Sequence, residues 1–304
     1  MTPSATLLKP GGRVAAYVRS TGAVDGEDHF ATTGMLVTSI NAGLARCRAG
    51  QNDIVYVLPG HTETFTAADS LTFVAGAQVI AVGRLGATNN PTLLWNNTAA
   101  TVLMNDANCS LIGFNMDFTG VDAVVAPITI SAAGCMLACN LITVAGGSEG
   151  ATTPVTVALG ADNCFILGNK MLATGTQTEV NIISITGAVD NLEIAGNSIS
   201  CLLTSATGGI IQIGAAATNL DIHHNLFYNS VEDGVCIRVA DTFAATGWVY
   251  NNYGKTIDAG GTVANTVKLI SFEGTTESLI GCFENYATDE AVASGALSPA
   301  IATT

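Results

Sequence analysis

Short apolar stretches recur along the chain at a nearly constant spacing. Five of them alternate apolar, polar and apolar side chains, at residues 128–130, 155–157, 183–185, 211–213 and 237–239, so that their first positions are 27, 28, 28 and 26 residues apart. Alternation with a period of two is typical of a strand that buries one face. A repeat of this length, built from short strands, predicts a solenoid.

A second pattern keeps the same period and ends on asparagine. It is clearest at residues 163–169, 191–197 and 219–225, and looser copies end at Phe114, Asn140, Asn252 and Asn285, which gives end-to-end spacings of 26, 29, 28, 28, 27 and 33. A third, weaker apolar stretch follows each of these corners. Three short strands in each repeat predict an all-β, single-stranded parallel β-helix with three strands per coil.

The repeated asparagine has a physical role in such a coil. At an inward corner its amide is able to bond backbone groups of its own coil and the identical amide on the next coil, about 4.8 Å away. Buried polar groups persist when they are paired, so the ladder has to be continuous. We expect its members to be Asn140, Asn169, Asn197, Asn225, Asn252 and Asn285.

Cysteine usage and charge limit the chemistry. Cys109, Cys135 and Cys164 occupy the position that Leu192 and Leu220 take in later repeats, so we interpret them as small core residues. The sequence has no CxxC and no Cys/His cluster at zinc spacing, and we expect no metal and no cofactor. A net charge of −14 argues against nucleic-acid and anionic membrane partners.

The ends of the chain differ from the repeats. We divide it into an N-terminal arm (1–30) that contains a strand at 14–18, a capping helix and first strand (31–60), the parallel β-helix (61–287) and a C-terminal tail (288–304) without a core-forming pattern. The helix is expected to start at Thr32 or Thr33 and to end near Gly50, because Leu36, Ile40 and Leu44 recur every four residues. The start lacks an apolar signal core, which predicts synthesis in a reducing cytoplasm.

Residues 51–60 follow the predicted capping helix and read Gln-Asn-Asp-Ile-Val-Tyr-Val-Leu-Pro-Gly. A capping helix followed by this segment resembles the entry segment of the pectin-lyase-like right-handed parallel β-helix superfamily. The preceding segment 20–26 resembles the approach to that helix in phage tailspikes and related virion β-helix proteins, which are commonly homotrimers. The resemblance covers about residues 20–286. It implies a right-handed coil and a trimer, and it implies much less about function, because this fold has many functions.

The resemblance also supplies two tests for catalysis. Pectate-lyase-like activity needs an arginine base beside calcium-binding aspartates. Arg238 lies in an outward slot without an acidic calcium cluster beside it, and the nearby Glu232, Asp233 and Asp241 do not form a loop with dense alternating ligands. Polygalacturonase-like activity needs paired aspartates and a Gly-His-Gly segment, and neither occurs. Both activities are therefore not expected.

Outward positions on the first strand of each coil hold the remaining candidate chemistry. Stacking is expected to place Glu193 and Asp221 about 5 Å apart, a separation that retaining glycosidases use. Trp248 and Tyr250 on the next coil would stack a sugar ring, and His223 would tune a proton. This alternative makes the chain a tailspike-type glycan depolymerase, or a carbohydrate-binding adhesin without hydrolysis.

The same outward rows continue as an apolar stripe, which marks a protein interface. We expect a homotrimer that buries Ile112, Met136, Phe165, Leu167, His223, Trp248 and Tyr250, with Glu193 and Asp221 as a polar layer. The preferred functional hypothesis is a phage virion structural protein that decorates or cements the head. It would be made in the host cytoplasm, lie on the capsid surface and bind the major capsid protein or other virion proteins.

Overall fold

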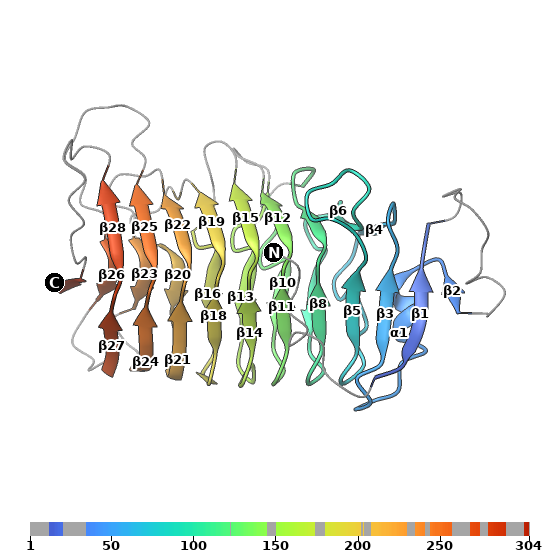
Figure 1. Cartoon of the computed structure of the whole chain (residues 1–304), viewed down its shortest axis with the longest axis horizontal. Helices are drawn as coiled ribbons and strands as arrows, with labels where there is room; N and C mark the ends of the chain where they lie inside the picture. Colours follow the sequence, from blue (N-terminus) through green and yellow to red (C-terminus); the bar gives the residue numbers. More distant parts are fainter. Residues whose placement is uncertain are drawn as a thin grey trace.

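The computed structural model describes residues 12–20, 35–121, 123–144, 150–173, 180–201, 203, 208–229, 235–240, 244–256, 268–273, 279–289 and 301–303. The chain winds as a right-handed coil along one axis, with α1 and β1 at one end and β26 to β28 at the other (Figure 1). Every strand pairing among the described residues is parallel, and each coil from β5 onward adds one strand to each of three sheets. The predicted fold class, a parallel β-helix, is confirmed.

Sheet A contains the first strand of each coil. It also extends beyond β3 at its N-terminal edge, because the predicted strand at 14–18 pairs in parallel with β3. In spatial order its strands are β2 (Leu36–Val37), β1 (Val14–Val18), β3 (Ile54–Val57), β5 (Gln78–Ala81), β8 (Ser110–Ile112), β11 (Met136–Ala138), β14 (Phe165–Leu167), β18 (Glu193–Ala195), β21 (Ala217–His223), β24 (Ala245–Tyr250) and β27 (Leu279–Phe283), and β17 (Val189–Asp190) pairs with β21.

Sheet B follows the asparagine corner of each coil. Its strands are β4 (Thr62–Phe65), β6 (Thr92–Trp95), β9 (Asn115–Asp117), β12 (Leu141–Val144), β15 (Lys170–Ala173), β19 (Ser198–Cys201), β22 (Leu226–Asn229), β25 (Tyr253–Thr256) and β28 (Tyr286–Asp289). Sheet C holds the alternating stretches that the sequence made most visible. Its strands are β7 (Val102–Met104), β10 (Ile128–Ile130), β13 (Val155–Val157), β16 (Ile183–Ile185), β20 (Gly209–Ile213), β23 (Val235–Val239), β26 (Lys268–Phe272) and β29 (Ile301–Thr303).

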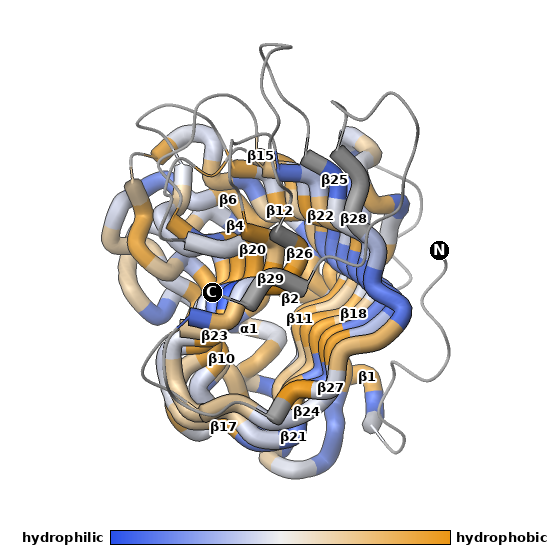
Figure 2. The backbone as a smooth tube through the Cα atoms, turned by 90° about the vertical axis from the view of Figure 1, so that its left-hand side faces the viewer, coloured by the Kyte–Doolittle hydropathy of each residue, from blue (hydrophilic) through white to orange (hydrophobic). Residues whose placement is uncertain are grey.

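The core runs through the middle of the three sheets. Hydrophobic positions lie behind one another from coil to coil when the molecule is viewed along its axis (Figure 2). On sheet A the inward row is fully buried and consists of Leu111, Leu137, Ile166, Ile194, Ile222 and Val249. Cys109, Cys135 and Cys164 are also fully buried, and all eight cysteines are free thiols, as the core interpretation predicts.

The asparagine ladder forms in the predicted register. Asn169 shows the repeated geometry: its backbone N–H and its side-chain Nδ2 both donate to Oδ1 of Asn197, at 2.9 and 3.0 Å, and Nδ2 also donates to the Leu137 carbonyl at 2.9 Å. The same contacts join the other neighbours in the series, from Asn140 to Asn285. Each amide thus ties two coils together.

The N-terminal helix is shorter than the sequence pattern predicts. Helix α1 spans only Ile40–Leu44, and the Ser39 hydroxyl accepts a hydrogen bond from the Ala42 N–H as its N-cap. Residues 36–37 belong to β2 rather than to the helix, because the neighbouring edge of β1 offers them backbone partners that a four-residue spacing cannot reveal. Thr32 and Thr33, the predicted cap residues, lie outside the described residues.

Helix α1 nevertheless covers the inner side of the first strands. Ile40 and Leu44 are buried, and a Cβ added to Gly43 would lie 2.7 Å from Cγ1 of Val55, so the helix backbone packs closely on β3. Its contacts are with β1, β2 and β3. A short helix is therefore sufficient to cover the apolar end of the solenoid.

The C-terminal boundary also differs. Strand β28 continues to Asp289, past the predicted end of the β-helix at residue 287, and β29, within the predicted unpatterned tail, pairs in parallel with β26. Backbone pairing to a sheet edge needs no apolar pattern, which is why composition did not reveal it. Within the described part of the chain, no helix has the length and apolar character to cross a membrane.

Candidate functional site

Two parallel rows of outward residues run along sheet A, and we call them together the outer stripe. One row is Ser110, Met136, Phe165, Glu193, Asp221 and Trp248, and the other is Ile112, Ala138, Leu167, Ala195, His223, Tyr250 and Phe283. Each residue is paired in register with its neighbours in its row. The sequence predicted this register correctly, because the corner that follows these strands recurs at a nearly constant spacing.

The N-terminal half of the outer stripe is less accessible than predicted. Ile112 is 2% exposed and Met136 is 5% exposed in the single chain, and both belong to a small apolar cluster on the outer side of sheet A. Phe165 and Leu167 pack against this cluster and are half-buried. Ile112 and Met136 are thus already buried within the chain, so little of their surface is left for a partner to cover. A side chain that faces outward is still covered when its neighbours on adjacent coils are large.

A charged group occupies the middle of the stripe. Nε2 of His223 lies 3.3 Å from Oε1 of Glu193 and 3.7 Å from Oδ2 of Asp221, so the imidazole is placed between the two predicted carboxylates. Nδ1 of His223 is 2.8 Å from Nδ1 of His224, which the sequence analysis did not single out. One of these two nitrogens has to donate and the other to accept, so at least one ring is neutral.

His223 of this charged group is also the first of three stacked rings, which continue with Tyr250 and Phe283 on the next coils. The rings of His223 and Tyr250 lie 4.9 Å apart with an interplanar angle of 15°, and the rings of Tyr250 and Phe283 lie 4.8 Å apart at 7°. Loss of hydration raises the pKa of the Tyr250 phenol, and the negative charges of Asp221 and Glu193 raise it further. Because the rings cover one another's faces, mainly their edges are available to a partner.

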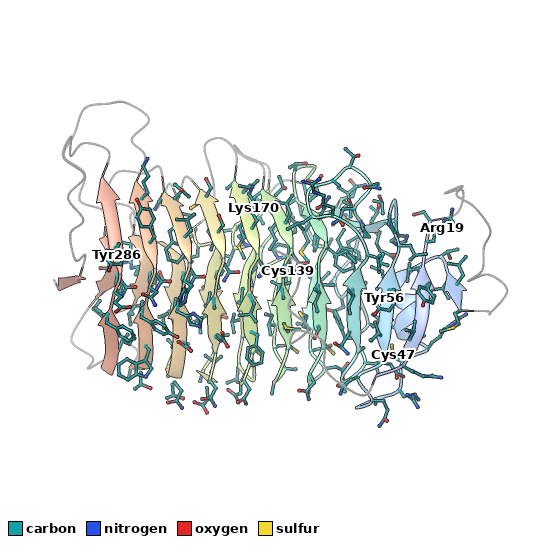
Figure 3. The ribbon with its side chains drawn as sticks, in the orientation of Figure 1. Arg19, Cys47, Tyr56, Cys139, Lys170 and Tyr286 are labelled. Atoms are coloured by element: carbon teal, nitrogen blue, oxygen red, sulfur yellow. The ribbon has the colours of Figure 1, made fainter. Side chains whose placement is uncertain are left out.

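Trp248 is arranged differently. It is 58% exposed, and a Cβ added to Gly281 on the next coil would lie 2.2 Å from Cζ3 of the indole, so the indole lies directly over Gly281. Phe283 meets the indole edge-on at 5.9 Å and 71°. Trp248 and Phe283, which is 44% exposed, thus form an exposed aromatic pair on the last coils of sheet A, and Tyr286 on β28 of sheet B (Figure 3) is also 44% exposed. Gly281 and Phe283 were missed because the looser final repeat hides its register.

The arrangement constrains the predicted glycosidase chemistry. A retaining glycosidase needs its two carboxylates on either side of the reacting sugar carbon. Here Nε2 of His223 lies between Glu193 and Asp221, within 3.3 and 3.7 Å of their oxygens. Catalysis would therefore require His223 to leave this position. The contacts as they stand form a paired polar layer.

Other predicted residues have structural partners. Arg238, in the outward slot of sheet C, forms an ion pair with Glu273. His61 is buried, and its ring lies 2.8 Å from Glu63. Among the residues that the structure describes, no group of three His, Cys, Asp or Glu side chains is arranged to hold a metal ion.

The fold and the outer stripe define a β-helix protein with one apolar and aromatic face. No protein-family model matches the chain, and no curated protein matches it. Among solved structures the chain is similar to a mutant pectin methylesterase in complex with a hexasaccharide, with 10% sequence identity and a TM-score of 0.46, over 96% of this chain and 93% of that one.

Proposed function

We propose that this chain is a trimeric structural β-helix protein of a phage virion, which decorates or cements the head and joins its subunits through the outer stripe. The observation that carries the proposal is the exposed aromatic pair of Trp248 and Phe283 at the end of that stripe. Exposed aromatic side chains grouped on one face are typical of protein interfaces. The virion assignment rests on the resemblance of residues 20–26 to the corresponding segment of phage β-helix proteins.

The geometry of the rings favours a protein partner over a sugar for most of the stripe. Sugars stack on open aromatic faces, whereas Tyr250 presents an edge because His223 and Phe283 cover both of its faces. The charged group is compatible with burial, because His223 is within reach of both carboxylates. A buried charge is tolerated when it is paired, so the layer can lie inside a subunit interface.

The oligomeric state tests the trimer directly. Light scattering of the purified chain is expected to give three times the chain mass of 30.9 kDa. Trp248→Glu places an unpaired charge in the interface and is expected to give a monomer, whereas Leu159→Glu, at a 72% exposed position outside the stripe, leaves the trimer intact. A monomeric wild-type protein would contradict the interface. Immunogold labelling of particles of the encoding phage then tests whether the chain lies on the head.

A second candidate function is glycan binding or cleavage at Trp248, Glu193 and Asp221. The observation in its favour is Trp248. One face of its indole lies over Gly281, the side chain is 58% exposed, and the carboxylates of Glu193 and Asp221 precede it in the same row. Calorimetry with host polysaccharides distinguishes the cases. An adhesin loses binding in Trp248→Ala and shows no cleavage, and a depolymerase loses cleavage in Glu193→Gln while it still binds. If the wild-type protein binds no polysaccharide, the glycan function is rejected and the structural role is retained.

A further inference from the structure

Three side chains at the N-terminal end of the solenoid form a connected relay. Ser20 follows β1, His61 precedes β4, and Glu63 lies in β4, so the first coils bring them together. The Ser20 hydroxyl is 3.1 Å from Nδ1 of His61, and Nε2 of His61 is 2.8 Å from Oε2 of Glu63. The backbone N–H of Thr62 also donates to the Ser20 oxygen at 3.3 Å.

The partners determine where the protons lie. An ionised Glu63 carboxylate only accepts hydrogen bonds, so Nε2 of His61 carries a proton. In the neutral ring Nδ1 then has a free lone pair, and the Ser20 hydroxyl donates to it. This is the tautomer in which an imidazole is able to take the proton of a serine, with a carboxylate holding the ring from the other side.

Burial matches the three roles. His61 is 2% exposed, and the Glu63 side chain is 16% exposed, so water has little access to the bond between them. Ser20 is half-buried, which leaves part of it accessible from outside. A held base and a reachable hydroxyl are what nucleophilic catalysis requires.

We propose that Ser20, His61 and Glu63 form a nucleophilic serine site that acts on carboxylic esters. Ser20 Oγ bonds to the ester carbonyl carbon while its proton passes to Nδ1 of His61. The carbon–oxygen bond to the alcohol breaks, and the alcohol leaves with that proton. A water molecule then attacks the acyl-serine, its proton passes through His61 back to Ser20, and the carboxylic acid is released.

The relay also has a structural role, so stability alone cannot test the proposal. Oε2 of Glu63 accepts a hydrogen bond from the Ile40 N–H at 3.0 Å, which fixes the start of α1. Replacing Glu63 would loosen the helix whether or not the site is catalytic. The test therefore has to report on the nucleophilicity of Ser20 in the wild-type protein.

A fluorophosphonate probe provides this test, because it bonds covalently to an activated serine and releases fluoride. We expect peptide mass spectrometry to find the adduct on Ser20 of the native protein and to find none after denaturation in urea. Ser20→Ala is expected to remove the adduct and to lower kcat/KM for p-nitrophenyl acetate by about 100-fold. Ser70→Ala is a matched control, because the Ser70 hydroxyl bonds only the Ala67 carbonyl and no histidine.

Two results would overturn the proposal. One is a native protein whose Ser20 is not modified, and the other is a Ser20→Ala variant that hydrolyses the ester as fast as the wild type. The circular dichroism spectrum of each variant shows whether it is folded. The proposal is independent of the trimer, because Ser20 lies outside the outer stripe.

Discussion

The asparagine ladder offers the sharpest test of what holds the coils together, and Asn197→Ala interrupts it in the middle. Asn197 donates from Nδ2 to the Ile166 carbonyl at 2.9 Å and to Oδ1 of Asn225 at 3.0 Å. Its own Oδ1 accepts from the backbone N–H and from Nδ2 of Asn169, at 2.9 and 3.0 Å. The substitution removes all four bonds, while the Asn197 backbone N–H keeps its acceptor on Asn225.

The four lost bonds do not cost the same. The backbone N–H of Asn169 is left buried without its acceptor, and an unsatisfied buried donor costs about 1–3 kcal/mol. Nδ2 of Asn169 keeps its bond to the Leu137 carbonyl, and the two acceptors that lose Nδ2 of Asn197 are oxygens with a second lone pair, so each of these losses costs only about 0.5 kcal/mol. Together we expect Asn197→Ala to lower the free energy of unfolding by about 2.5–4.5 kcal/mol.

Urea denaturation followed by circular dichroism measures this difference. Asn96→Ala is the matched control, because Asn96 is exposed and outside the ladder, and we expect it to change stability by less than about 0.5 kcal/mol. Asn197→Asp should be at least as damaging as Asn197→Ala, because a carboxylate oxygen would face the Ile166 carbonyl and the Asn225 oxygen. Equal midpoints for Asn197→Ala and the wild type would refute the ladder as a source of stability.

Two further predictions follow from buried titratable groups. The bidentate hydrogen bonds from Arg48 hold the pKa of the fully buried Asp53 carboxyl well below its usual range. The stabilising contribution of Asp53 is therefore complete above about pH 4 and is lost as pH falls through the lowered pKa. In thermal melts at pH 7 and pH 3, Asp53→Asn should lose less stability on acidification than the wild type, and equal losses would contradict the pairing. Burial raises the pKa of the Cys236 thiol to about 12 and that of Cys47 to about 11, and the Asp53 charge adds to the effect at Cys47. Both thiols should therefore resist a maleimide at pH 7 until urea is added. Rapid modification of these thiols in the native protein would count against the burial.

Much of the fold could be predicted from the sequence because a solenoid repeats its constraints. The coils of the ladder each carry one amide at the same corner, so the spacing of Asn169, Asn197 and Asn225 set the register of β14, β18 and β21 on sheet A. The N-terminal end has no such repetition. There residues 36–37 pair with the edge of β1 as a strand, and the helix has only five residues.

The candidate sites were harder to predict for a related reason. Register placed Glu193 beside Asp221, but it could not show that His223 would turn between them. It also could not show that Met136 would be covered within the chain. The relay at Ser20 and His61 joins residues 41 positions apart on different coils, outside any repeated pattern, so no periodicity could have indicated it.

The inward and outward faces of sheet A share one strand register but differ in the residue types along their rows. The inward row stays aliphatic from Leu111 to Val249, because each position packs against its copies on the adjacent coils. The outward row changes from Phe165 to Glu193 and Asp221 and then to Trp248, although stacking alone would accept a uniform row. Packing of the coil does not require this change. In the proposed trimer this change would fix how the facing chains align, because a charged layer between two apolar segments fits only one alignment, and a shift by one coil would place an aromatic ring against a carboxylate.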